Sequence, residues 1–150
     1  MQRQRGLTLL ELLVVLAIIG VAMAGVSLSL RDSRQTQLER EAQRLIAVLE
    51  AARAQSRTSG IALIWQATPD GFVVRPTPEG RASPIATRTE PWLTAGTQAS
   101  ADNANTVALG PEPILLPARI TLRVIRTDSQ APAPSLIVGT DGLRPFQVLP

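Results

Sequence analysis

The chain has 150 residues, with 15 basic and 12 acidic side chains and a formal net charge of +3 at pH 7. Arginine supplies all of the basic side chains, and histidine, cysteine, lysine and tyrosine are absent. A thiolate nucleophile, a lysine Schiff base and a side chain that titrates near neutrality are therefore excluded, so an enzyme would have to work with carboxylates and hydroxyl groups. We expect no catalytic residue, no cofactor and no metal site.

The N-terminal sequence is a short basic leader, MQRQRG at residues 1–6, followed by an apolar run from Leu7 to Leu30. Glu11 is the one charged side chain in that run. About 20 apolar residues suffice to cross a bilayer, so residues 7–30 predict a transmembrane or filament-core helix. A carboxylate at membrane depth costs roughly 2.5–3.5 kcal/mol on insertion scales, which marks Glu11 as a candidate functional residue.

Cleavage of the leader would create a new amino terminus, and its ammonium group is a cation that could neutralise Glu11. If the leader is cut after Gly6, the new ammonium group lies on Leu7, and the two groups are within about one helical turn along the axis. Between parallel helices staggered by about a turn, the amine of one chain would meet the carboxylate of its neighbour. Because screening is weak in hydrocarbon, such a pair could also select the register of the helices.

Two simpler interpretations of this segment remain open. Ala22-Met23-Ala24 matches the small-x-small cleavage site of a secretory signal, and cleavage there would release a soluble periplasmic protein. Alternatively, the run is a plain N-terminal anchor. In the anchored forms the basic leader favours a cytoplasmic amino terminus, which places the larger C-terminal part in the periplasm of a bacterium.

Residues 31–59 predict a continuation of the same helix with one apolar and one charged face. The charged face carries two i, i+3 ion pairs, Glu41 with Arg44 and Glu50 with Arg53, each worth about a few tenths of a kcal/mol. Gly60 is the expected C-cap. The apolar side chains recur at i, i+3 and i+4 spacing, at Leu38, Ala42, Leu45, Ile46, Leu49 and Ala52.

Residues 60–150 predict a β-rich domain. Segments 61–67 and 72–75 form a predicted hairpin around the turn Thr68-Pro69-Asp70-Gly71. Residues 76–113 predict long irregular connections with one short strand around Trp92. Further strands are expected at 119–127, 136–138 and 146–149. The predicted fold class is therefore α+β, with a long N-terminal helix packed on a mostly antiparallel sheet or sandwich.

Two further clusters resemble binding sites, and in both the simpler interpretation is favoured. Asp102, Asn103 and Asn105 offer oxygen ligands of the kind that Ca²⁺ prefers, but their spacing matches no specific calcium loop. A basic patch could bind nucleic acid, but few aromatic side chains are available to stack on bases, so we expect a solvated surface and no nucleic-acid partner. The patch would comprise Arg81, Arg88, Arg119, Arg123 and Arg126.

The segment Gly6-Leu7-Thr8-Leu9-Leu10-Glu11, followed by the long apolar run, resembles the class III signal of type IV pilins and type II secretion pseudopilins. The resemblance implies that a prepilin peptidase cuts between Gly6 and Leu7 and that the new amine of Leu7 is then methylated. It also implies a pilin-like fold and a role for Glu11 in assembly. Leu7 departs from the phenylalanine that usually follows the cut in that family.

Beyond the signal, the chain is similar to the general secretion pathway protein H family of minor pseudopilins. The similarity lies in the amphipathic segment 38–45, the hairpin over 61–75 and the Asp141-Gly142 turn before Phe146. It implies a structural subunit of the type II secretion pseudopilus, single-pass in the bacterial inner membrane with its C-terminal domain in the periplasm.

The partners implied by this resemblance are other pseudopilins (the major subunit and the minor subunits of the tip), the prepilin peptidase, the inner-membrane secretion platform and membrane lipid. The FimT-like minor pilins of type IV pili, which serve pilus assembly or DNA uptake, share the domain family and form the alternative. A signal-anchored periplasmic enzyme that uses carboxylates is the third hypothesis.

Overall fold

The computed structural model describes the backbone of residues 9–78, 84–102, 105–125 and 133–150, without the side chains of residues 24–34. The chain divides into two compact units, Met1–Gln35 and Thr36–Pro150, and each is considered by itself. The predicted leader, with Gly6 and Leu7, lies outside the described residues.

Helix α1 runs from Leu9 to Ser59 and contributes to both units. The helix ends as the sequence predicts, because Gly60 adopts a positive φ of 68°, which glycine tolerates without steric cost. Arg57 lies in the last turn, where its positive charge favours the partial negative charge of the helix C-terminus.

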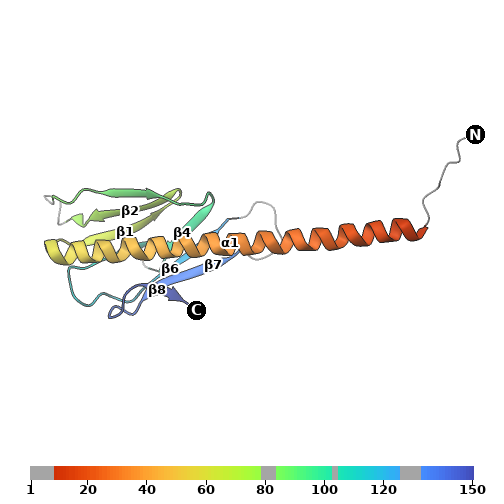
Figure 1. Cartoon of the computed structure of the whole chain (residues 1–150). Coiled ribbons are helices and arrows are strands. Elements are labelled where there is room, and N and C mark those ends of the chain that lie inside the picture. Colours follow the sequence, from red (N-terminus) through yellow and green to blue (C-terminus); the bar gives the residue numbers. More distant parts are fainter. Residues whose placement is uncertain (1–8, 79–83, 103–104, 126–132) are drawn as a thin grey trace, which may run out of the picture. The chain divides into compact units, whose positions relative to one another are not determined.

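Among the described residues of the second unit, eight strands form two antiparallel four-stranded sheets on the C-terminal half of α1 (Figure 1). The first sheet has the order β3-β2-β1-β5 and the second has the order β4-β6-β7-β8. In chain order the strands are β1 (Leu63–Thr68), β2 (Gly71–Pro76), β3 (Arg88–Pro91), β4 (Thr97–Ala101), β5 (Thr106–Ala108), β6 (Ala118–Val124), β7 (Ser135–Thr140) and β8 (Gln147–Leu149). The α+β fold class is therefore confirmed.

The predicted hairpin is confirmed in its position and its turn. Thr68 pairs with Gly71 and Trp65 with Val74, so the loop between β1 and β2 consists of Pro69 and Asp70. Proline fixes one φ in this turn. Packing also requires glycine at position 71, because a Cβ there would overlap the Glu90 carbonyl group of the neighbouring β3.

The prediction for residues 76–113 was wrong. The described residues of this region, 76–78, 84–102 and 105–113, include the three strands β3, β4 and β5, where the sequence predicted one short strand around Trp92. Trp92 itself follows β3. The three strands are short, and each pairs with a strand that is distant in sequence: β3 with β2, β4 with β6, and β5 with β1. Val107 is the one large aliphatic side chain in these three strands, so long-range pairing rather than local propensity makes them strands.

Side chains from α1 and from both sheets share one apolar core. The helix contributes a stripe that includes Leu38, Leu45 and Leu49, each at most 1% exposed. Trp65 and Phe72 are fully buried there. Phe72 lies between the two tryptophans, with ring centroids 6.1 Å from Trp65 and 5.2 Å from Trp92. The second half of α1 is therefore a core element of this unit.

Candidate assembly site

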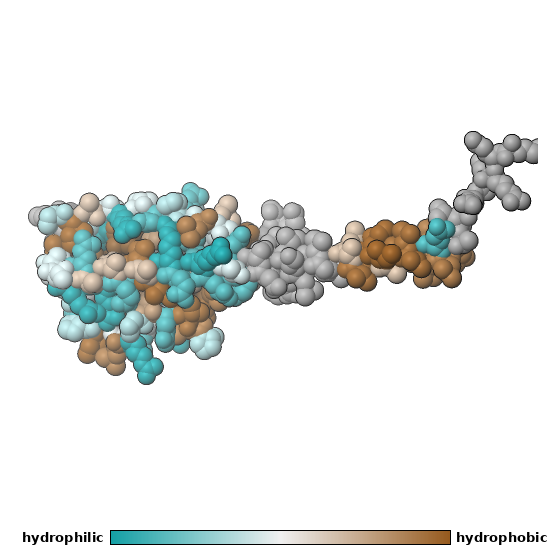
Figure 2. Space-filling view, viewed as in Figure 1, coloured by the Kyte–Doolittle hydropathy of each residue, from teal (hydrophilic) through white to brown (hydrophobic). Residues whose placement is uncertain are grey.

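The first part of α1 presents apolar side chains to its surroundings. Every residue from Leu9 to Met23 is exposed, and Figure 2 shows the described part of this segment as an almost wholly apolar surface. Leu9 is 82% exposed and Met23 is 70% exposed. Within the described residues, no helix is both long and apolar enough to cross a membrane.

Glu11 lies in the first turn of this segment and is exposed among the apolar side chains. A carboxylate there is favoured by the partial positive charge of the helix N-terminus. The other predicted site residues, Gly6 and Leu7, lie outside the described residues. The cleavage site, the methylated amine and the charge pair of Glu11 with that amine therefore stay predictions.

In the second part of α1, charged side chains bond to distant segments of the chain, which the sequence did not predict. Glu41, predicted on the charged face of the helix, is fully buried. Its carboxylate accepts a hydrogen bond from the Leu93 backbone N–H at 2.7 Å and pairs with Arg44 at 3.3 Å, as the i, i+3 spacing predicts. Burial is tolerated because both carboxylate oxygens have partners. Glu41 therefore ties the helix to the segment after β3.

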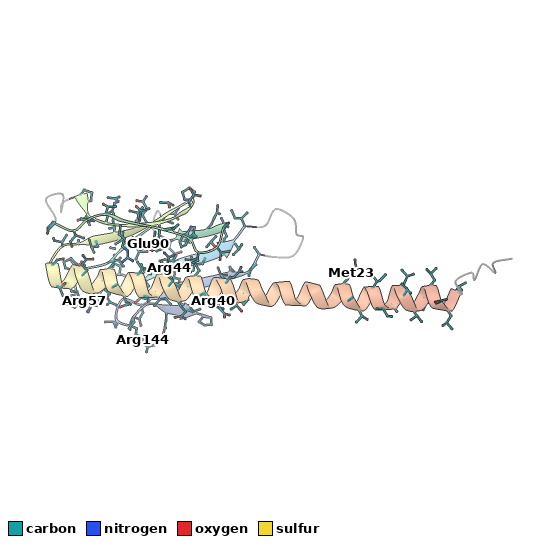
Figure 3. All side chains as sticks on the ribbon, turned by 45° about the horizontal axis from the view of Figure 1, so that its top comes forward. Met23, Arg40, Arg44, Arg57, Glu90 and Arg144 are labelled. Atoms are coloured by element: carbon teal, nitrogen blue, oxygen red, sulfur yellow. The ribbon has the colours of Figure 1, made fainter. Side chains whose placement is uncertain are left out.

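Arg44 extends this tie to β3 itself. Its guanidinium pairs with the Glu90 carboxylate, donates to the Pro91 carbonyl oxygen at 2.8 Å and lies 5.7 Å from the centroid of the Phe72 ring. Figure 3 shows Arg44 extending from α1 toward Glu90. The pKa of Glu90 is lowered, first by the hydrogen bond from Arg88 at 2.6 Å and then by Arg44.

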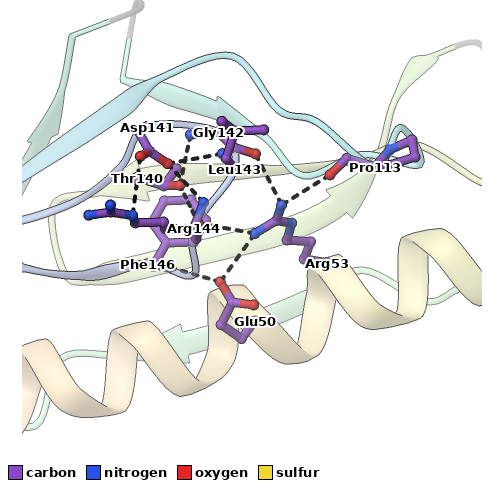
Figure 4. Close-up of polar contacts among 9 residues, drawn as sticks. All are labelled: Glu50, Arg53, Pro113, Thr140, Asp141, Gly142, Leu143, Arg144 and Phe146. Carbon is purple, nitrogen blue, oxygen red and sulfur yellow. Dashed lines mark hydrogen bonds and ion pairs between the residues drawn. The ribbon is translucent and has the colours of Figure 1, made fainter.

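Arg53 and Glu50 tie the other side of the helix to loops around the second sheet (Figure 4). Arg53 is 3% exposed, and its guanidinium donates to the carbonyl oxygens of Pro113 and Gly142, each at 3.2 Å, and of Arg144 at 3.4 Å. Glu50 pairs with Arg53 at 3.7 Å, as predicted, and accepts the Phe146 backbone N–H at 2.9 Å. The sequence predicted the pair of Glu50 with Arg53 but not the bonds that either side chain makes to distant loops.

The turn after β7 is closed by its own side chains. Thr140 Oγ1 accepts the Gly142 N–H at 2.9 Å and donates to the Arg144 carbonyl oxygen at 2.6 Å. Asp141 accepts the N–H groups of Arg144 at 2.8 Å and Leu143 at 3.0 Å. These two bonds, that from Arg144 first, lower the pKa of the Asp141 carboxyl. The predicted Asp141-Gly142 turn is therefore confirmed, with Gly142 at a φ of 92°.

The structure describes only part of the candidate calcium site and of the candidate basic patch. Arg119 and Arg123 are exposed on β6, Arg88 pairs with Glu90, and Arg81 and Arg126 lie outside the described residues. Asn103 also lies outside them, and the Asn105 side chain accepts the Ala101 N–H at 3.1 Å. No group of three or more acidic, histidine or cysteine residues that could hold a metal ion occurs in the part of the chain that the structure describes.

A family model and a solved structure are similar to this chain. A family model described as the prokaryotic N-terminal methylation motif matches residues 1–27. Among solved structures, the type IV minor pilin FimU of Pseudomonas aeruginosa (strain PAO1) is similar, with a TM-score of 0.57 and 17% sequence identity, covering 79% of this chain and 92% of that chain. No curated protein matches the chain.

The family model and the similar structure each establish one property of this chain. The chain carries a prokaryotic N-terminal methylation motif, and its helix and two antiparallel sheets have a pilin-like α+β fold. At 17% identity the likeness to FimU shows the fold alone.

Proposed function

We propose that this chain is a minor pseudopilin, a structural subunit of a type II secretion pseudopilus that helps to export folded proteins across the outer membrane. Two features support the proposal: the N-terminal methylation motif over residues 1–27 and the pilin-like fold of the domain that follows. In this proposal a prepilin peptidase cuts between Gly6 and Leu7, the new amine of Leu7 is methylated, and residues 7–30 hold the chain in the inner membrane with the domain in the periplasm.

The observation that carries the proposal is an exposed carboxylate, Glu11, within an exposed apolar helical segment that belongs to the matched motif. An ion in an apolar environment needs a counter-ion, because desolvation costs several kcal/mol per ion. The amine of Leu7 on a neighbouring subunit supplies that counter-ion only when the two helices lie side by side in the correct register. Glu11 would thus make assembly both favourable and register-specific.

The proposed role is mechanical and consists of binding. The apolar segment holds the subunit in lipid before assembly and against other pseudopilins afterwards, while the secretion platform drives the filament. The chemical reactions, peptide cleavage and amine methylation, are carried out on this chain by the prepilin peptidase. The ties made by Glu41, Arg44, Glu50 and Arg53 would transmit force between the helix and the sheets, because each crosses from α1 to a distant segment.

A minor pilin of a type IV pilus is the second candidate, and the fold likeness to FimU, itself a type IV minor pilin, favours it. Deletion of the gene separates the two functions: loss of protein export supports the pseudopilin, and loss of pili or DNA uptake supports the pilin. Duplex DNA binding by the full chain, with an affinity that falls steeply with salt, would also support a pilin used in DNA uptake.

The first experiment is the intact mass and N-terminal sequence of the protein purified from its native membrane. We expect a chain that begins at Leu7 and carries one methyl group on its amine. A mature chain that begins at Met1 or Gly25 would overturn the proposal, because the proposed charge pair could not form.

The second experiment replaces Glu11 with alanine in the full chain. We expect normal membrane insertion and a strong loss of incorporation into filaments, since the neighbouring amine loses its counter-ion. Glu39→Ala is the matched control, because Glu39 is an exposed glutamate on the same helix, outside the apolar segment. Equal incorporation of the two variants would count against the role of Glu11.

A further inference from the structure

We draw no further inference here: the strongest candidate, the apolar groove between the second part of α1 and the first sheet that is lined by Val48, Leu63 and Val74, carries no proposal, because nothing in the part of the chain that the structure describes shows what covers it.

Discussion

The two parts of helix α1 place their apolar side chains in opposite surroundings. From Leu9 to Met23 every residue is exposed, whereas Leu38, Leu45 and Leu49 are at most 1% exposed. The acidic residues differ in the same way. Glu11 is exposed among apolar side chains, and Glu41 is fully buried with a backbone donor and an arginine.

This contrast shows that a helix does not determine by itself what covers it. Backbone hydrogen bonding and good propensity make both parts helical, but stability in proteins comes mostly from packing of an apolar face. The second part finds that packing within its own chain. In the proposed function the first part finds it in lipid and in other subunits.

The fluorescence of the two tryptophans can measure how much each part of α1 contributes to the stability of the second unit. The measurement uses the full chain in detergent micelles. Both lie in the core of the second unit, at 0% exposure for Trp65 and 9% for Trp92. Their fluorescence during denaturant unfolding therefore reports the stability of that unit and is insensitive to the exposed segment.

The largest expected effect comes from truncating one leucine in each part. We expect Leu49→Ala to lower the free energy of unfolding of the second unit by about 2–5 kcal/mol, because it leaves a cavity in a packed core. Leu16→Ala should change it negligibly, since Leu16 is 61% exposed in the other unit. Similar losses from the two variants would show that the exposed segment also stabilises the domain.

The buried acid should give the next largest effect. Glu41→Ala removes the acceptor of the Leu93 N–H and the partner of Arg44, so we expect a loss of about 1–3 kcal/mol in the free energy of unfolding. Glu41→Gln retains an oxygen acceptor and should lose less. Glu39→Ala, at an exposed position two residues earlier, serves as the control. If Glu39→Ala and Glu41→Ala are equally stable, the tie does not stabilise the fold.

The glycines of the two regions should respond in opposite directions to alanine. Gly60→Ala forces a side chain into a left-handed φ and should destabilise the second unit by about 1–2 kcal/mol. Gly20 lies inside the helix, where an added Cβ would meet no neighbouring side chain within 4 Å, so Gly20→Ala should favour the helix by up to about 1 kcal/mol. Circular dichroism follows the helix, and tryptophan fluorescence should show a change for Gly60→Ala alone.

The smallest expected effect is a dependence on pH. Because the pKa of Glu90 is lowered in the folded state, its carboxylate stabilises the fold above its ordinary pKa of 4.5. That contribution is lost as the pH falls below this value and through the folded-state pKa. Glu90→Gln should therefore lower the free energy of unfolding by less than about 1 kcal/mol near neutral pH, since such pairs are screened by solvent.

The difference between Glu90→Gln and the unmodified protein should vanish on acidification. Asp141, whose pKa is also lowered, titrates in both proteins and cancels in this comparison. Denaturant midpoints near neutral pH and in acid provide the measurement. A difference that persists in acid would show that Glu90 acts through packing rather than charge.

Local patterns in the sequence were enough to predict several elements. The apolar spacing from Leu38 to Ala52 indicated the packed face of α1, Gly60 indicated its end, and Pro69-Asp70 indicated the turn of the hairpin. The two i, i+3 ion pairs were also predicted correctly. Each of these depends on residues a few positions apart, so the signal lies within one short segment.

Contacts between distant segments were not predictable in this way. The strands β3, β4 and β5 carry weak propensity and depend on partners elsewhere in the chain. Nothing in the spacing of Glu41 or Arg53 distinguishes it from a solvated surface charge. The loops that contain Leu115 and Gly142 likewise lie together because Arg53 bonds to both of them and a backbone hydrogen bond joins them.

The sequence by itself determined a helix with an apolar, once-charged beginning and an amphipathic continuation, followed by an antiparallel β-rich domain. Only the tertiary structure decided which charges are buried, which short segments become strands and which apolar side chains remain exposed. The physical reason is that helix period, caps and tight turns are local properties of the backbone. Burial is a property of the whole packed domain, because a charge or a leucine is buried only when distant residues supply its partners.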